Sequence, residues 1–211
     1  YLENDATAAC AGVWWHTIKD KYSNWIMLTL GTGIGGGAVI DGRLFTGQTG
    51  SSMEVGHMSL DPQGPLCPCG NRGCFELYSS ATALVKHVKL KMKSFPSSAL
   101  KPVNNGELTA KKIYEAALIG DTLALEGINH VSVYLGIGIA NLINIFNPEA
   151  VIIGGGLSQA SKLLFPKMKE VIKERAMKGL KENVKFIAVK EQSMIAALGA
   201  AKIARDRYNL T

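Results

Sequence analysis

The chain has 211 residues, of which 47% are hydrophobic, and a formal net charge of +6 at neutral pH. This length and apolar content exclude a disordered chain and predict a globular protein with a substantial core. Many lysines fall within 86–112 and 162–190, where helical spacing places them on solvated faces, and aromatic and basic residues do not alternate. A nucleic-acid groove is therefore not favoured.

The first third of the chain predicts one helix and three strands. The polar pair Asn4-Asp5 leads into a run of small residues that predicts a helix over 6–18. Residues 25–30 predict a buried strand, which ends in the glycine-rich turn Gly31-Thr-Gly-Ile-Gly-Gly-Gly37. Residues 38–45 predict a hairpin, because an Asp-Gly dipeptide that tolerates positive φ separates two short apolar runs.

The rest of the chain alternates predicted helices with predicted strands. In chain order these are a helix over 76–93, a loop over 95–107, helices that begin at Thr109 and Asp121, a strand over 150–153, a helix near 160–178, a strand near 184–189 and a helix over 193–208. Thr and Asp are good N-caps. The alternation predicts an α/β fold with a mixed sheet.

The sequence favours a cytoplasmic protein that does not contact the membrane. We find no secretory signal, and the longest apolar run, near 131–146, is interrupted by Gly136 and Gly138, so no membrane span is expected. In a reducing compartment, clustered cysteines bind metal more often than they form disulfides. Cys10 lies far from the other three cysteines and is expected to be a small buried residue.

One histidine and three cysteines, His57, Cys67, Cys69 and Cys74, gather within eighteen residues. Zinc prefers four such ligands in a tetrahedron, and the proline and glycines between the cysteines let the chain fold back around an ion. Four protein ligands leave no open position for a reactive water, so a structural zinc is expected. The ion would hold the neighbouring carboxylates of Glu54 and Glu76 in fixed positions.

Glycine-rich turns follow two predicted strands, at 31–37 and at 154–156. Such turns leave backbone N–H groups free to face a phosphate, although most are only tight turns. Neither turn has the spacing of a P-loop, and the first runs into a strand rather than the helix of a dinucleotide fingerprint.

Asn4-Asp5 has two interpretations. The pair could cap the following helix, or Asp5 could be a carboxylate at a cleft that accepts a proton from a substrate hydroxyl. The residues by themselves do not decide between them.

The order of these motifs is specific. The chain reads Asn4-Asp5, then Leu30 to Gly37, then Glu54-Val-Gly-His57, then Cys67 to Glu76, then Ile153-Gly-Gly-Gly-Leu157. This order resembles the ROK family (repressors, open reading frames and sugar kinases), and within it the bacterial-type glucokinases, over essentially the whole chain.

The resemblance implies an actin/hexokinase-like fold with a ribonuclease-H-like mixed sheet flanked by helices and a zinc-binding loop. Asp5 would be the general base on the 6-hydroxyl of a hexose, and Asn4, Glu54, His57 and Glu76 would bind the other hydroxyls. His57 would also bind zinc through one ring nitrogen. Gly31, Thr32, Gly33 and Gly35 would face the phosphates of ATP with Mg²⁺, and Gly154, Gly155 and Gly156 would lie near the adenosine.

The chain also departs from the family pattern. The expected N-terminal lobe, with its Asp-x-Gly-Gly-Thr phosphate loop, is not in this sequence. Residues 1–211 are therefore expected to be the C-terminal part of a ROK kinase, with a large domain over about 20–211 and the Asn4-Asp5 segment at its cleft. We expect this chain alone not to phosphorylate sugar. Thr7 and the run 51–53 also differ from the usual pattern and leave the identity of the sugar open.

Several functions therefore stay open. The first is an ATP-dependent hexose kinase, with glucose preferred over N-acetylmannosamine, N-acetylglucosamine and fructose. The second is the sugar-sensing domain of a ROK transcriptional repressor, which would bind nucleic acid only through an upstream DNA-binding module. A third is a zinc-stapled sugar-binding module without catalysis. The resemblance also implies a homodimer.

Overall fold

The computed structural model describes residues 3–101, 108–189 and 192–208, and its centre is a five-stranded sheet. The strands are β1 (Trp25–Leu30), β2 (Ile34–Ile40), β3 (Arg43–Leu44), β4 (Ala150–Gly154) and β5 (Lys185–Ala188). Their order across the sheet is β3-β2-β1-β4-β5. The pairs β1–β2 and β2–β3 are antiparallel, whereas β1–β4 and β4–β5 are parallel, so the sheet is mixed as predicted.

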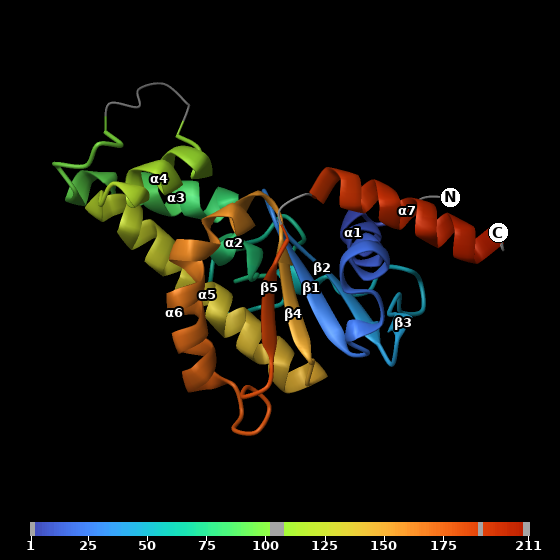
Figure 1. The fold of residues 1–211 in the computed structure, drawn as a ribbon. Helices are drawn as coiled ribbons and strands as arrows, with labels where there is room; N and C mark the ends of the chain where they lie inside the picture. The colour runs from blue at the N-terminus through green and yellow to red at the C-terminus, as the bar shows by residue number, and fades with distance from the viewer. Residues whose placement is uncertain (1–2, 102–107, 190–191, 209–211) are drawn as a thin grey trace.

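Helices cover both faces of this sheet. The α-helices of the described residues are α1 (Asp5–Val13), α2 (Glu76–Ser79), α3 (Ala81–Lys91), α4 (Ala110–Leu118), α5 (Thr122–Phe146), α6 (Ser161–Arg175) and α7 (Gln192–Tyr208). Figure 1 shows α5 and α6 over one face and α1 and α7 over the other, which makes three layers.

The two faces of the sheet bury separate cores because successive side chains of a strand point in opposite directions. Along β1, Ile26, Leu28 and Leu30 belong to the core on the side of α5 and α6. Trp25 and Met27 belong to the core on the side of α1 and α7. A central strand that is buried on both faces must be apolar throughout, which explains its continuous hydrophobic run.

Glycines allow α1 to approach both of its neighbours closely. A Cβ on Gly12 would collide with the backbone carbonyl of Ile195 in α7, and a Cβ on Gly199 would collide with that of Ala8 in α1. On the sheet side, Gly37 of β2 leaves room for the side chain of Cys10. The small-residue composition of this helix therefore reflects tight packing.

The turn within the glycine-rich segment is shorter than the sequence predicts. Strand β2 begins at Ile34, so Gly35, Gly36 and Gly37 lie within the sheet and only residues 31–33 form the turn. Strands usually avoid glycine, but here a Cβ on Gly35 would lie 2.8 Å from Cβ of Ala6. Close packing of α1 overrides the local preference.

Two predicted helices also differ in their boundaries. The helix predicted over 76–93 divides at Ser80, whose extended backbone separates α2 from α3 and whose hydroxyl accepts a hydrogen bond from the N–H of Ala83. The helix predicted over 6–18 is α-helical to Val13 and continues as a π-helical turn over Trp14–Ile18. Part of the predicted loop, residues 102–107, lies outside the described residues.

Helix α5 runs without a break through Gly136 and Gly138, from its predicted cap at Asp121 to Phe146. By length and composition it could cross a membrane, and 56% of its most apolar window is buried inside the protein. It packs against the sheet and α6, and many of its side chains belong to the larger core. Its apolar composition is that of a core helix.

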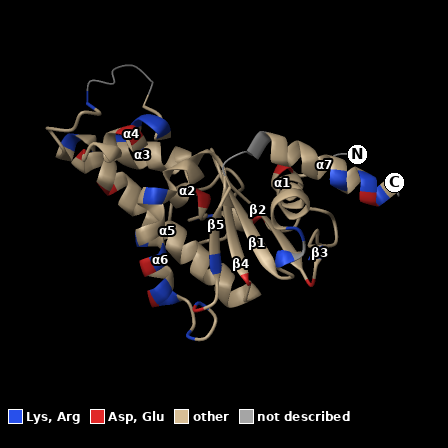
Figure 2. Ribbon diagram, viewed as in Figure 1, with Lys and Arg blue, Asp and Glu red and all other residues tan. Residues whose placement is uncertain are grey.

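Charged side chains gather on the outer helices. Figure 2 shows lysine and arginine interspersed with acidic residues on α6 and on the C-terminal part of α7. The basic stretches of the sequence thus lie on solvated faces of mixed sign, as expected.

Candidate functional site

Two glycine turns meet at one edge of the sheet. Because β1 and β4 are parallel neighbours, their C-terminal ends lie together and so do the turns that follow them. Gly31, Thr32 and Gly156 line the same hollow of about 420 Å³. The structure therefore brings together two segments that are more than a hundred residues apart in the chain.

Not every glycine predicted to bind the nucleotide lies in this hollow. Gly154 ends β4 and pairs with Thr29, and Gly155 has a positive φ of 94°, with its Cα against the carbonyl of Leu30. Gly35 lies in β2. Gly33 also lies outside the lining of the hollow, so only Gly31, Thr32 and Gly156 of the predicted set line it. Gly156 has open space where a side chain would be.

The opposite wall of the hollow was missed by the sequence analysis. It is formed by the start of α4 and by the residues after Gly156, namely Thr109, Ala110, Lys111, Tyr114, Leu157, Gln159 and Ala160, with Ala81 from α3. No local motif marks these residues, because only the tertiary fold brings α4 against the turns. Tyr114 and Leu157 offer apolar surface of the kind that suits a flat heteroaromatic ring.

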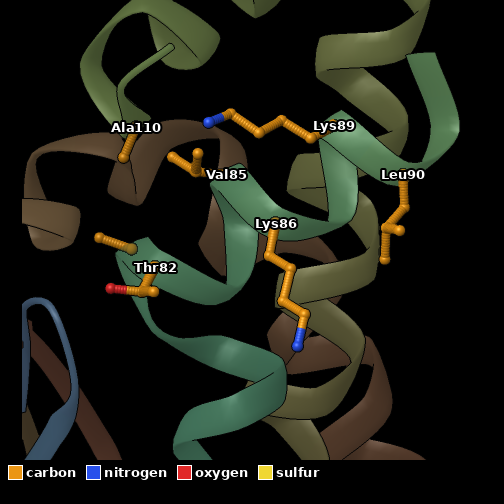
Figure 3. Close-up of a pocket in the computed structure, with 7 residues that line it drawn as sticks. Thr82, Val85, Lys86, Lys89, Leu90 and Ala110 are labelled. Atoms are coloured by element: carbon orange, nitrogen blue, oxygen red, sulfur yellow. The ribbon is translucent and has the colours of Figure 1, made fainter. Parts of the chain in front are cut away.

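A larger hollow of about 600 Å³ lies on the outer side of α3, beside the first. Figure 3 shows its lining, in which the side chain of Lys89 extends toward Ala110 past Val85, whereas that of Lys86 points away from both. None of the residues predicted for the site lies in it. It is a surface groove next to the site and shares only Ala81 and Ala110 with the first hollow.

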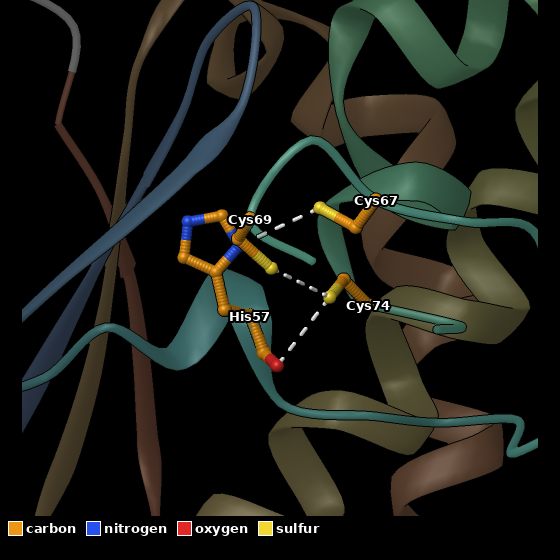
Figure 4. Close-up of side chains that lie close together, drawn as sticks. All are labelled: His57, Cys67, Cys69 and Cys74. Carbon is orange, nitrogen blue, oxygen red and sulfur yellow. Dashed lines mark hydrogen bonds between the residues drawn. The ribbon is translucent and has the colours of Figure 1, made fainter. Parts of the chain in front are cut away.

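The four predicted metal ligands converge. The ligand atoms of His57, Cys67, Cys69 and Cys74 all lie within 4.8 Å of one another (Figure 4). The Sγ atoms of Cys69 and Cys74 are 3.6 Å apart, and Nδ1 of His57 lies 3.7 Å from Sγ of Cys67. A tetrahedron with Zn–S bonds of about 2.3 Å has ligand atoms separated by about 3.5–3.8 Å. The residues therefore fit a tetrahedral zinc ion.

Backbone hydrogen bonds preform the segment 57–74, which we call the zinc loop after the ion that its four candidate ligands fit. The N–H of Cys67 donates to the carbonyl of Asn71 at 2.8 Å, and the N–H of Gly70 donates to the carbonyl of Cys67 at 2.9 Å. The side-chain amide of Asn71 donates to the carbonyl of His57 at 3.2 Å. A Cβ on Gly73 would collide with the carbonyl of Asp61, so this position needs glycine for space as well as for its φ of 63°.

The thiols of the loop differ in acidity. Burial raises the pKa of the Cys74 thiol to about 12. A hydrogen bond from the backbone of Asn71 lowers the pKa of the Cys69 thiol, which is exposed. Because zinc binds thiolates, loading the loop must release the Cys74 proton.

His57 presents its two ring nitrogens to different surroundings. Nδ1 faces the cysteines, whereas Figure 4 shows the other ring nitrogen pointing away from them. The side chain is 38% exposed, and Nδ1 also lies 3.6 Å from Oε1 of Glu76. One imidazole can therefore bind a metal on one side and accept or donate a hydrogen bond on the other.

Glycines also place the segment that carries Glu54 and His57. A Cβ on Gly36 would collide with the carbonyl of Met53, and a Cβ on Gly56 would collide with that of Ile34. The segment therefore lies directly on β2. Met53 has a φ of 62°, which is unusual for a residue with a side chain and marks local strain just before Glu54.

Asn4 caps α1 and also reaches across to Glu54. Its Oδ1 accepts hydrogen bonds from the N–H groups of Ala6 at 2.9 Å and Thr7 at 3.1 Å. Its Nδ2 donates to Oε1 of Glu54 at 3.4 Å. Asp5 is the exposed first residue of the helix, where the helix dipole favours a negative charge.

Glu76 joins the zinc loop to the first glycine turn. Its Oε1 lies 3.5 Å from Sγ of Cys67, and its Oε2 lies against Gly33, where an added Cβ would be 2.5 Å away. Phe75 fixes this position, because its fully buried ring packs on the Cα of Gly138 in α5. Metal ligands, carboxylates and glycine turn are therefore contiguous.

Comparisons with known proteins identify the family of the chain. The family model described as "ROK family" matches residues 1–207. The chain is 38% identical over 209 residues to a glucokinase of Thermotoga maritima, which covers 98% of this chain and 66% of that protein. It is 37% identical over 200 residues to a xylose repressor of Caldicellulosiruptor bescii, which covers 94% of this chain and 50% of that protein.

Solved structures give the same result. A ROK family glucokinase from Streptomyces griseus, in complex with glucose and AMPPNP, superposes with a TM-score of 0.88 and 32% identity, covering 97% of this chain and 68% of that one. The fold is therefore actin/hexokinase-like, as the resemblance implied. The chain spans about two thirds of the Thermotoga glucokinase and half of the xylose repressor. By its sequence, its fold and its zinc-loop motif, this chain belongs to the ROK family.

Proposed function

We propose that this chain forms the sugar-binding and proton-accepting part of an ATP-dependent hexose kinase that is similar to glucokinase. One observation carries the proposal: the turn over 31–33 touches Glu76 on one side and lines the 420 Å³ hollow on the other. A sugar held by Glu76 and a nucleotide in the hollow would therefore meet at this turn. Phosphoryl transfer depends mainly on such positioning.

In this proposal Asn4, Glu54, His57 and Glu76 hold the hydroxyl groups of the sugar. The carboxylates accept hydrogen bonds from hydroxyls, and Nε2 of His57 faces away from the cysteines to reach another. Asp5, beside Asn4, accepts the proton of the 6-hydroxyl as that oxygen attacks the terminal phosphate. A site of this kind rejects sugars that lack a hydroxyl, because its polar groups would be left unpaired.

Two bound groups complete the site. Zinc, bound by His57 and the three cysteines, would fix the loop that carries the carboxylates and take no part in the chemistry. ATP with Mg²⁺ would place its phosphates at Gly31–Gly33 and its base between Tyr114 and Leu157. The complex of the Streptomyces relative with glucose and AMPPNP supports this pairing of ligands.

The first experiment is glucose binding by the isolated chain, measured by isothermal titration calorimetry. We expect binding that Glu54→Gln weakens at least about tenfold, because a hydrogen bond to a charged group is worth about 1.5–3 kcal/mol. Glu174→Gln, a change on the exposed face of α6, is the matched control and should bind as the wild type does. Absence of glucose binding by the wild-type chain, together with no binding of other hexoses, would contradict the proposal.

The second experiment addresses turnover. We expect the chain alone to give no glucose-dependent ADP release, since the predicted N-terminal lobe with its phosphate loop would be required. In a longer form that is active, Asp5→Asn should abolish turnover and leave glucose affinity within about twofold. Asp41→Asn, in the distant hairpin turn, is the control. Full activity of the Asp5→Asn form would exclude Asp5 as the base.

The similarity to xylose repressors favours a second candidate, the sugar-sensing domain of a repressor. Such a domain would bind sugar without using a nucleotide. Titration with AMPPNP and Mg²⁺ in the presence of glucose separates the two, because only the kinase is expected to bind both. A competition panel of glucose, xylose, fructose and the N-acetylated hexosamines would identify the sugar.

A further inference from the structure

Gly33 is a glycine for reasons that the conformation of the turn does not explain. Its φ lies outside the left-handed range, so a residue with a side chain could adopt the same backbone conformation. What distinguishes Gly33 is its neighbour, because an added Cβ would lie 2.5 Å from Oε2 of Glu76 and 3.7 Å from its Cδ. Gly31, two residues earlier in the same turn, has nothing within 4 Å of the corresponding position.

Glu76 is held from its other side as well. Its Oε1 lies 3.6 Å from Nδ1 of His57 and 3.5 Å from Sγ of Cys67, and its side chain is only 21% exposed. The carboxylate is therefore enclosed between the zinc loop and the bare Cα of Gly33. The turn is also fixed to the next helix, because the N–H of Ala81 donates to the carbonyl of Gly31 at 2.9 Å.

We propose that Gly33 is a positioning residue for sugar binding, which sets the place of the Glu76 carboxylate by leaving room for it. This inference rests on the proposed function and adds to it, because Gly33 was expected only to face phosphates. It makes the glycine turn part of both substrate sites. A side chain at residue 33 would displace the carboxylate from the sugar even with no nucleotide present.

The geometry also predicts that the protein tolerates the change. The atom in the way is the end of a flexible glutamate side chain, which can rotate aside at little cost, whereas a backbone atom could not. Gly33→Ala should therefore fold with nearly unchanged stability and lose sugar affinity. If Gly33 had a purely structural role, Gly33→Ala would lower the stability and leave the sugar affinity of the folded protein unchanged.

The test is glucose binding without nucleotide, measured by calorimetry for the wild type, Gly33→Ala and the exposed α6 control Glu174→Gln. Gly33→Ala should weaken binding about tenfold or more, as expected for one misplaced charged hydrogen bond. Glu174→Gln should stay within about twofold, and urea unfolding should give similar stabilities for all three. In a Glu76→Ala background, Gly33→Ala should have no further effect, because the two changes act on one contact.

The outcomes separate this inference from the proposed function. If the wild type binds glucose and Gly33→Ala binds equally well, the inference is wrong and the proposed function stands. The same holds if Gly33→Ala weakens binding equally in the Glu76→Ala background. If the wild type binds no hexose, the proposed function fails, and crystal structures of the wild type and of Gly33→Ala still decide the packing claim. A displaced Glu76 carboxylate in Gly33→Ala alone would support it, and an unmoved carboxylate would overturn it.

Discussion

Asn4 belongs to the pair for which the sequence allowed a helix cap, and the family resemblance also gives it a role in sugar binding; its side chain has the atoms for both. The oxygen of the amide caps α1 while its nitrogen donates to Glu54. Capping and binding are therefore not alternatives at this position. The two roles can be separated by a substitution that preserves only one of them.

Asn4→Ser should keep the cap, because serine caps helices about as well as asparagine, but its shorter side chain cannot reach Glu54. Asn4→Ala should lose both and cost about 1 kcal/mol of stability. Urea unfolding should therefore distinguish Ala from Ser, and glucose titration should find both variants weakened. Wild-type glucose affinity in Asn4→Ser would show that the contact with Glu54 has no part in binding.

At this scale the sequence predicts best where the chemistry is local. The convergence of the candidate metal ligands His57, Cys67, Cys69 and Cys74 could be predicted because their types and spacing suffice. The contact of Gly33 with Glu76 could not, since it depends on where α2 settles against the turn. The roles of Asp5 and Glu54 in catalysis and binding remain predictions that the experiments above address.

Among the elements, α5 is fixed at its start by an unusually well-bonded cap, Asp121. Its carboxylate accepts hydrogen bonds from the N–H of Ala124 at 2.9 Å, the N–H of Ala99 at 2.7 Å and the hydroxyl of Ser98 at 3.1 Å. Burial alone would raise the pKa of this carboxyl group, but the hydrogen bonds outweigh burial and hold it below its usual value. The cap therefore also fastens the loop that precedes α4.

A carboxyl group whose pKa is lower in the folded state than in the unfolded state stabilises the protein at pH values above its unfolded-state pKa. This contribution is lost as the pH falls through the folded-state pKa. We expect the wild type to lose stability below about pH 4 partly through Asp121. Asp121→Asn keeps a capping side chain and should make the unfolding free energy less dependent on pH in that range. Urea unfolding of both proteins from pH 6 to pH 3 measures this, and parallel curves would contradict it.

A second element-scale prediction concerns Gly138 in the middle of α5. Alanine usually stabilises a helix by about 1 kcal/mol relative to glycine. Here the added methyl group would overlap with the ring of Phe75, whose Cε1 and Cε2 atoms would lie 2.6 Å away. Overpacking of this kind usually destabilises a protein by about 1–3 kcal/mol. Gly138→Ala should therefore destabilise the protein or at best leave it unchanged, as judged by urea unfolding.

The matched control uses Phe75→Leu, which removes the ring and opens the space beside Gly138. In that background Gly138→Ala should become stabilising, because only the helix propensity remains. An equally large loss of stability in both backgrounds would mean that Phe75 is not the obstacle.

Most elements could be predicted from the sequence because periodicity and caps are local signals. Strand β1 and helix α5 have the predicted boundaries, including the cap at Asp121. Strand β2 could not be located correctly, because three glycines argue for a turn unless the tight approach of α1 is known. The division at Ser80 was missed for a similar reason, since Ser79 turns inward to donate to the carbonyl of Val131 in α5.

For the whole molecule, the zinc loop is the feature whose removal should have the widest effect. Protein purified without chelator should contain about one zinc per chain. Removing it should lower the melting temperature by several degrees, because 1 kcal/mol corresponds to about 2–4 °C in a chain of this size. The measurements are metal analysis and calorimetry before and after chelation.

Cys69→Ser should lose most of the metal, whereas Cys10→Ala, a change in the other core, should keep it. Metal-free wild-type protein with an unchanged melting temperature would contradict a structural zinc. So would full zinc content in Cys69→Ser.

The α/β class and the mixed sheet could be predicted from the alternation of elements, and the family resemblance supplied the actin/hexokinase-like topology. The hollow that we propose for the nucleotide is marked in the sequence only in part. Its glycine turns are marked in the sequence, but Tyr114 joins them through the docking of α4, for which the chain has no local signal. The homodimer that the resemblance implies is a prediction that sedimentation can test.

The alternation of β1 between two cores has a consequence for insertions. One extra residue between Met27 and Leu28 would turn every later side chain of the strand to the opposite side of the sheet. Leu28 and Leu30 would then face α1, which packs so closely against its glycine-containing neighbours that large side chains have no space there. The same slip would rotate the peptide groups of residues 31–33 away from the hollow, so a single inserted codon should cost stability and ligand binding together.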